Sequence, residues 1–184
     1  FSVQVDKGIA KQLKASQKQV LTLRVWNNKN LVGITTTSDL SENGLKKALY
    51  QANLASEYGN KNELTDFSPL AKDPIEMIKV VKRTPAGIKK LLEKLRIAEN
   101  ELLNKHSAIK TIPYNGLSES FFKRIYANSD GAQRSYEKSQ AAIYLYARAE
   151  EINRKPRSSG SVKIGYGLED IDINSCIDEA AEKT

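Results

Sequence analysis

The feature that most constrains the fold of this chain is the tetrapeptide Asn-Ser-Asp-Gly at residues 128–131, together with the segments on either side of it. Residues 118–127 and 133–149 are rich in aromatic and branched side chains, which favour β-strands. Glycine readily takes the positive φ that a tight hairpin turn requires. The sequence therefore predicts a long β-hairpin that turns at the Asp-Gly step.

Shorter alternating segments predict the remaining strands. Residues 19–26 place Leu21, Leu23 and Val25 on one face, and the turn cluster at 27–30 leads into a partner strand over residues 31–37. We expect further strands over residues 1–6, 9–15, 109–113 and 161–164. The chain is therefore expected to open with an antiparallel meander.

Helical spacing predicts a first helix that begins after Ser41, whose hydroxyl is well suited to cap it. Its apolar residues recur every three or four positions, and they are Leu45, Ala48, Leu49, Ala52 and Ala55. A short helix is also conceivable around residues 75–80, and a C-terminal helix is predicted over residues 172–183.

A second main helix is predicted to begin at Thr84, followed by Pro85 at the first helical position, and to reach Lys105. One side carries an apolar stripe that we expect to be core. The stripe consists of Ile88, Leu91, Leu92, Leu95, Ala98 and Leu102. Charged side chains, Glu99 among them, mostly occupy the other faces.

Together these elements predict an α+β fold with a largely antiparallel sheet, two main helices packed on one face of it, and a C-terminal helix. The leucines of both helices should then be buried against the strands. The expected contacts join Leu45, Leu49, Leu91, Leu92 and Leu95 to Leu21, Leu23, Ile143 and Leu145. We expect residues 1–184 to form a single domain, the N-terminal fragment of a longer protein.

Composition and residue counts limit the chemistry of the chain. No apolar run reaches the length of about 20 residues that a membrane helix needs. The single cysteine, Cys176, suits a reducing cytosol, and no base is evident that would activate it as a nucleophile. The single histidine, His106, has no second imidazole with which to hold zinc. Carboxylates at Asp170, Asp172 and Asp178 are better interpreted as a solvated helix start than as a metal site.

A net charge of +7 permits contact with nucleic acid or an acidic partner. One local basic cluster is visible, and it comprises Lys79, Lys82, Arg83, Lys89 and Lys90. Tyr136, Tyr144 and Tyr146 lie on one strand, which is superficially similar to proteins that stack bases on aromatic rings. Cross-strand packing is the favoured explanation of these rings, and specific binding of nucleic acid is not expected.

The order of the elements carries a resemblance to a known family. Residues 33–41 read Gly-Ile-Thr-Thr-Thr-Ser-Asp-Leu-Ser and lead into a helix; a second helix and the Asn-Ser-Asp-Gly hairpin follow. In this order the chain resembles the N-terminal domain of the TldD/PmbA family, whose members were once called modulators of DNA gyrase and are now regarded as metallopeptidase subunits. The stretch at 36–41 looks more like the PmbA (TldE) branch.

The resemblance implies a role in proteolysis. Such proteins work in pairs, in which a TldD-type subunit carries a His-Glu-x-x-x-His metal motif and a TldE-type partner lacks it, and the pair cleaves unfolded peptides. This sequence has no such motif. The resemblance therefore implies a cytoplasmic, non-catalytic scaffold domain without catalytic, cofactor-binding or metal-binding residues of its own, partnered by a TldD-like subunit and peptide substrates, away from membranes. The alternative is a basic module that binds nucleic acid or gyrase and has no enzymatic activity.

Overall fold

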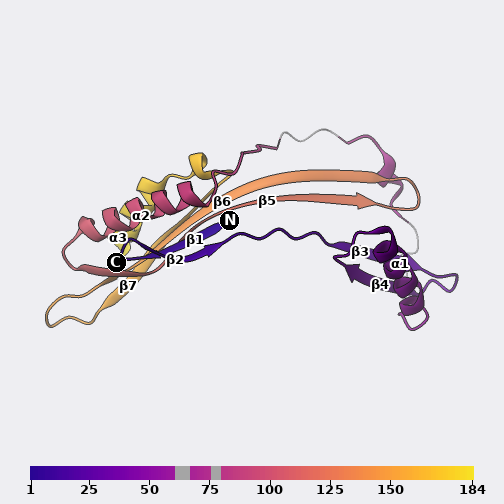
Figure 1. The fold of residues 1–184 in the computed structure, drawn as a ribbon, viewed down its shortest axis with the longest axis horizontal. Helices are drawn as coiled ribbons and strands as arrows, with labels where there is room; N and C mark the ends of the chain where they lie inside the picture. The colour runs from indigo at the N-terminus through magenta and orange to yellow at the C-terminus, as the bar shows by residue number, and fades with distance from the viewer. Residues whose placement is uncertain (61–66, 76–79) are drawn as a thin grey trace. The chain divides into compact units, whose positions relative to one another are not determined.

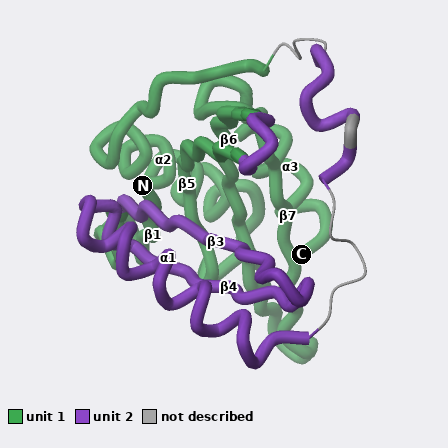
Figure 2. Tube along the Cα trace, turned by 90° about the vertical axis from the view of Figure 1, so that its right-hand side faces the viewer, with its two compact units in different colours: residues 1–16, 76–127, 133–184 green, residues 17–75, 128–132 purple. Residues whose placement is uncertain are grey.

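The computed structural model describes residues 1–60, 67–75 and 80–184. The chain forms two compact units, drawn in different colours in Figure 2. Unit 1 comprises residues 1–16, 76–127 and 133–184, and unit 2 comprises residues 17–75 and 128–132. The predicted α+β class with antiparallel sheets and a C-terminal helix is confirmed. No helix in the described part of the chain is both long enough and apolar enough to cross a membrane.

Unit 1 is built on a five-stranded sheet in the order β2-β1-β5-β6-β7, in which all neighbouring strands are antiparallel. The strands are β1 (Ser2–Asp6), β2 (Ile9–Lys14), β5 (Ile109–Ala127), β6 (Gln133–Ala149) and β7 (Arg157–Gly165). The opening strands therefore divide between two sheets, because β1 and β2 pair with each other in unit 1 while the next two strands belong to unit 2.

The predicted hairpin is confirmed, and β5 and β6 form the centre of the sheet (Figure 1). Their pairing runs from Ile109 opposite Ala149 to Ala127 opposite Gln133. The two strands predicted at 109–113 and 118–127 are one continuous strand, because register shifts on either side of Thr111 accommodate Pro113 within the ladder. In the turn, Gly131 has a φ of 87°.

Two helices cover one face of this sheet, as Figure 1 shows: α2 (Ile88–Lys105) and α3 (Ile173–Lys183). Contacts join α2 to β1 and β5, α3 to β6 and β7, and the helices to each other. The fully buried side chains between helices and sheet include Leu91, Leu95, Leu102, Leu117, Ile143, Leu145 and Ile177. Each such side chain contributes roughly 1.5–3 kcal/mol by leaving water. The predicted core stripe of α2 is therefore confirmed, with Ile88 and Leu92 at its half-buried margin.

The start of α2 differs from the prediction. The helix begins at Ile88, its N-cap is Gly87 with a φ of 83°, and Thr84 and Pro85 lie outside it. The backbone N–H of Ala86 donates instead to the Glu119 carboxylate at 2.7 Å. The local helix-start signal is overridden because the segment before Gly87 makes hydrogen bonds to the sheet.

Unit 2 contains a two-stranded sheet of β3 (Leu21–Trp26) and β4 (Val32–Thr37), followed by α1 (Glu42–Ser56). The predicted cap is confirmed, since Ser41 Oγ accepts a hydrogen bond from the Gly44 N–H at 3.1 Å. A short 3₁₀ helix, η1 (Pro69–Lys72), lies later in the unit. The helix predicted around residues 75–80 falls mostly outside the described residues.

Small residues bring α1 close to β4. A Cβ on Gly33 would lie 1.9 Å from the carbonyl oxygen of Ala52, so only glycine allows this approach. The buried residues of α1 are Gly44, Ala48, Ala52 and Ser56. The predicted burial of Leu45 and Leu49 is wrong, because they are 39% and 50% exposed. In contrast to the expectation of one shared sheet face, α1 covers β3 and β4 while α2 covers the sheet of unit 1.

Candidate functional site

The carboxylates weighed as metal ligands all have structural partners. Asp170 accepts hydrogen bonds from Arg83 Nε at 2.9 Å and Nη2 at 2.7 Å. Asp172 caps α3 by accepting from the Ser175 N–H at 2.9 Å, and Asp178 forms an ion pair with Lys105. Within residues 1–60, 67–75 and 80–184, no three His, Cys, Asp or Glu side chains gather in a group that could hold a metal ion.

Cys176 and His106 do not form a nucleophile and base. Cys176 is completely buried, burial raises the pKa of its thiol, and its Sγ lies 3.6 Å from the Ser161 carbonyl oxygen. His106 is exposed at the C-terminal end of α2, where its Nδ1 accepts a hydrogen bond from the Ala108 N–H at 3.1 Å. The buried thiol and the exposed imidazole therefore do not pair as nucleophile and base.

Acidic partners neutralise much of the predicted basic cluster. Lys82 pairs with Glu137, Arg83 with Asp170, and Lys90 with Glu169 at 3.6 Å. The Arg83 guanidinium lowers the pKa of Asp170, and Lys82 and Lys123 lower that of Glu137. Lys79 lies outside the described residues. These cations mainly stabilise the packing of the segment around residues 81–86, and they are poorly suited to bind phosphate.

Glu119, a buried carboxylate that the sequence reasoning missed, holds the segment around residues 81–86 to the sheet. Glu119 is 6% exposed, and besides the Ala86 N–H it binds the Leu168 N–H at 3.2 Å. Nearby, the backbone N–H of Arg83 donates to Ser139 Oγ at 3.0 Å. A sequence signal existed, because Glu119 alternates in phase with the apolar Leu117 on β5 and therefore faces the core.

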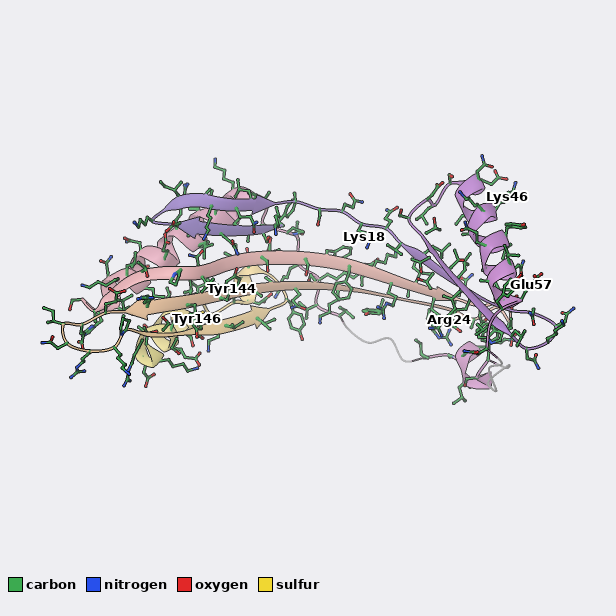
Figure 3. All side chains as sticks on the ribbon, turned by 90° about the horizontal axis from the view of Figure 1, so that it is seen from below. Lys18, Arg24, Lys46, Glu57, Tyr144 and Tyr146 are labelled. Atoms are coloured by element: carbon green, nitrogen blue, oxygen red, sulfur yellow. The ribbon has the colours of Figure 1, made fainter. Side chains whose placement is uncertain are left out.

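The three tyrosines of β6 singled out from the sequence lie on the opposite face of the sheet, which α2 and α3 leave uncovered. Tyr144 and Tyr146 are labelled in Figure 3. The ring of Tyr146 meets Tyr114 edge to face at 6.3 Å, and Tyr136 meets Phe122 in the same way at 6.1 Å. The expected aromatic cross-strand packing is confirmed for these pairs.

Two glycines lie beneath the tyrosines, a feature that the sequence analysis did not use. Gly116 is the cross-strand partner of Tyr144, and a Cβ there would lie 2.4 Å from the ring. Gly160 is the partner of Tyr146, and a Cβ there would lie 2.7 Å from that ring. Glycine inside a strand signals close approach of another group, so both positions could have been flagged.

Comparison with known sequences gives one family. Residues 82–184 match the PmbA/TldA metallopeptidase central domain. The matched range contains α2, the hairpin, β7 and α3, and thus most of unit 1. No curated protein matches the sequence.

Solved structures share the fold over nearly the whole chain. TldE from Thermococcus kodakarensis aligns with 99% of this chain and 41% of its own, at a TM-score of 0.84 and 16% identity. A candidate modulator of a DNA gyrase from Thermotoga maritima aligns with 100% of this chain and 41% of its own length, at a TM-score of 0.81 and 19% identity. A candidate modulator of DNA gyrase from Bacteroides thetaiotaomicron aligns with 98% of this chain and 42% of its own length, at a TM-score of 0.82 and 13% identity. The chain thus spans about two fifths of the length of these structures.

Proposed function

Because this chain belongs to the PmbA/TldA metallopeptidase family, we propose that it is a non-catalytic scaffold and assembly domain of a TldE/PmbA-like subunit. In this proposal the subunit works with a TldD-like partner, which supplies the metal site, and the pair processes unfolded peptides in the cytoplasm. The domain contributes a rigid scaffold to the two-subunit enzyme and no catalytic residue.

The observation that carries the proposal is the match to a metallopeptidase domain in a chain with a single histidine. A catalytic zinc is usually held by three protein ligands, most often including at least two histidines, and one imidazole cannot supply them. Of the other candidate ligands weighed above, Asp170 and Asp178 form ion pairs, Asp172 caps α3, and the Cys176 thiol is buried.

The structure of unit 1 suits a scaffold. Two helices and a five-stranded sheet enclose an apolar core, and buried Glu119 ties residue 86 and Leu168 to the central strand. A core packed at this level holds its shape because side chains interdigitate with few voids. Such a body can present fixed surfaces to a partner subunit.

Reconstitution tests the proposal. The 184-residue chain, a TldD-type subunit and their mixture are each incubated with an unstructured fluorogenic peptide, and zinc is measured in each protein by elemental analysis. We expect the chain alone to hold no stoichiometric zinc and cleave nothing, and the mixture to co-elute on size exclusion and to cleave faster than the TldD-type subunit alone.

His106→Ala is the matched control, since His106 is exposed and should be dispensable in the mixture. One tightly held zinc per chain, or hydrolysis by the chain alone, would overturn the non-catalytic role. A chain that neither co-elutes with the TldD-type subunit nor changes its activity would overturn the assembly role.

A further inference from the structure

The uncovered face of the sheet in unit 1 carries a second feature that the proposed function does not use. We define the open face as the even-numbered side chains of β5 from 114 to 126 and of β6 from 134 to 146. Cross-strand partners share a face, and because the alternating residues Leu117, Ile143 and Leu145 are buried in the core with α2 and α3, this face points away from the helices. Figure 3 shows the sheet from below and labels Tyr144 and Tyr146.

Two glycines make room for the tyrosine rings on this face. The outer end of the Tyr144 ring lies over Gly116, and Cδ2 of the Tyr146 ring lies beside Gly160. Gln4 Nε2 donates to the Tyr144 hydroxyl at 2.6 Å and fixes the ring in place. Tyr144 and Tyr146 remain 36% and 43% exposed, and the Tyr146 ring also contacts Tyr114 edge to face. Two positioned and partly exposed aromatic side chains therefore lie two positions apart on the same strand.

Both carboxylates of the hairpin strands lie on one face. The carboxylates of β5 and β6 are Glu119 and Glu137, and both belong to the covered face. Glu119 is buried, and Glu137 is held by Lys82 and Lys123. The open face bears cations instead, including Arg124 and Lys138. Among the described residues neither of these two forms an ion pair, and Lys138 Nζ lies 5.9 Å from the Phe122 ring centroid.

From these observations we propose that the open face binds single-stranded nucleic acid without sequence preference. Tyr144 and Tyr146 stack bases on their outer ring faces, and Lys138 and Arg124 bind phosphates farther along the hairpin. Lys138 lies six positions before Tyr144, or about 20 Å along the strand. Single-strand binders combine these two elements, a positive track and aromatic platforms, over sites of about 4–16 nucleotides.

The combination favours nucleic acid over an acidic polypeptide. Cations alone could bind either polymer. Exposed aromatic rings, however, stack best on a polymer that carries an aromatic ring in every repeating unit, as nucleic acid does. The basic cluster that the sequence suggested is less suited to this purpose, since Glu137, Asp170 and Glu169 pair with Lys82, Arg83 and Lys90. The site is thus distinct from the cluster that the sequence first suggested, and it is independent of the proposed scaffold role.

Fluorescence anisotropy with a labelled oligo-dT of about 12 nucleotides, within the usual range of site sizes, tests the proposal on the 184-residue chain. We expect the Tyr144→Leu/Tyr146→Leu variant to bind at least tenfold more weakly at low salt, while leucine still covers each glycine. Tyr144→Phe keeps the ring and should bind like the wild type. Thermal unfolding of each variant verifies that it is folded.

The cations are tested separately. Arg124→Gln and Lys138→Gln should each reduce the salt dependence by about 0.7 in the slope of log K against log salt, as expected for one lost phosphate contact. Lys155→Gln, on the exposed loop before β7, removes the same charge and should leave the slope unchanged.

Three outcomes of the DNA-binding measurements would overturn the proposal, and a comparison with an acidic polypeptide supplies a fourth. The three are the absence of binding at low salt, equal binding by the leucine variant, and equal binding of duplex DNA, which would indicate charge attraction alone. Polyglutamate of the same length is the remaining comparison. If it binds as tightly as oligo-dT, the ligand is an acidic polypeptide and the nucleic-acid assignment fails.

Discussion

The carboxylate of Glu99 on α2 holds the turn at Gly8, because its Oε2 accepts a hydrogen bond from the Gly8 backbone N–H at 2.7 Å. Its Oε1 accepts from the Lys7 N–H at 3.1 Å. Lys7 and Gly8 both have positive φ, 52° and 76°, as in the tight turns that join hairpin strands. A single side chain thus connects the helix layer to the turn between β1 and β2.

Glu99→Ala should lower the free energy of unfolding by about 1–3 kcal/mol, because two backbone donors lose a charged acceptor. Chemical denaturation measures the loss. Glu93→Ala removes an exposed carboxylate from the same helix and should stay within about 0.5 kcal/mol. Equal effects of the two substitutions would show that the Glu99 contacts contribute nothing to stability.

Leu95→Ala should cost about 2–5 kcal/mol, since Leu95 is completely buried and its loss leaves a cavity between α2 and the sheet. Lys94→Ala, one position away on the exposed side of the helix, should change stability by less than about 0.5 kcal/mol. Urea denaturation of both variants is the measurement. A small effect at Leu95 would contradict the packing of α2 described above.

Gly116→Ala should destabilise the sheet by about 1–3 kcal/mol, because the added methyl group would overlap the Tyr144 ring and force it to move. The penalty should shrink in a Tyr144→Leu background, where a flexible side chain replaces the ring. A double-mutant cycle measured by thermal or chemical unfolding gives the coupling directly. Additive effects would mean that the ring does not rest on this glycine.

Acid should weaken one contact between α3 and β7. Lys163, Lys183 and the Ser161 hydroxyl lower the pKa of Glu179 from 4.5 to about 2. Since the folded pKa is the lower one, the stabilisation is complete above about pH 4.5 and is lost as the pH falls toward 2.

Glu179→Gln should therefore be less stable than the wild type at pH 6, and the difference should close toward pH 2. Denaturant midpoints across this range measure the difference. Glu182→Gln, an exposed change on the same helix, should track the wild type throughout. A difference that persists unchanged at pH 2 would show that the charge of Glu179 is not its source.

Much of the local structure follows from sequence patterns. The hairpin, the Ser41 cap, the end of α2 at Lys105 and the stripe from Leu91 to Leu102 were all predictable, because turn chemistry, capping and periodicity act over a few residues. The start of α2 was not. Thr84 and Pro85 carry a valid local signal, but hydrogen bonds from residues 83 and 86 to the sheet decide the outcome.

The candidate site, too, could be predicted from the sequence only in part. The tyrosines of β6 were found from the sequence, whereas Arg124 and Lys138 were not singled out. Gly116 and Gly160 could be flagged as strand glycines, but the rings beside them could not be named, nor could the partners of Lys82, Arg83 and Lys90, because each depends on residues far away in the chain. The resemblance to the family likewise came from the order of elements, and the match over residues 82–184 established membership. The open face emerged only when the helices were seen to cover one side of the sheet.

By itself, then, the sequence determined which segments become helices and strands, and which side of α2 is apolar. Tertiary structure alone decided that α1 packs through Gly44, Ala48 and Ala52 while Leu45 and Leu49 stay exposed, and that α1 and α2 cover different sheets. It also decided that Glu99 and Glu119 are buried. The physical reason is that periodicity defines a face, whereas the partner of that face and the hydrogen bonds that allow a charge to be buried are supplied by residues distant in sequence.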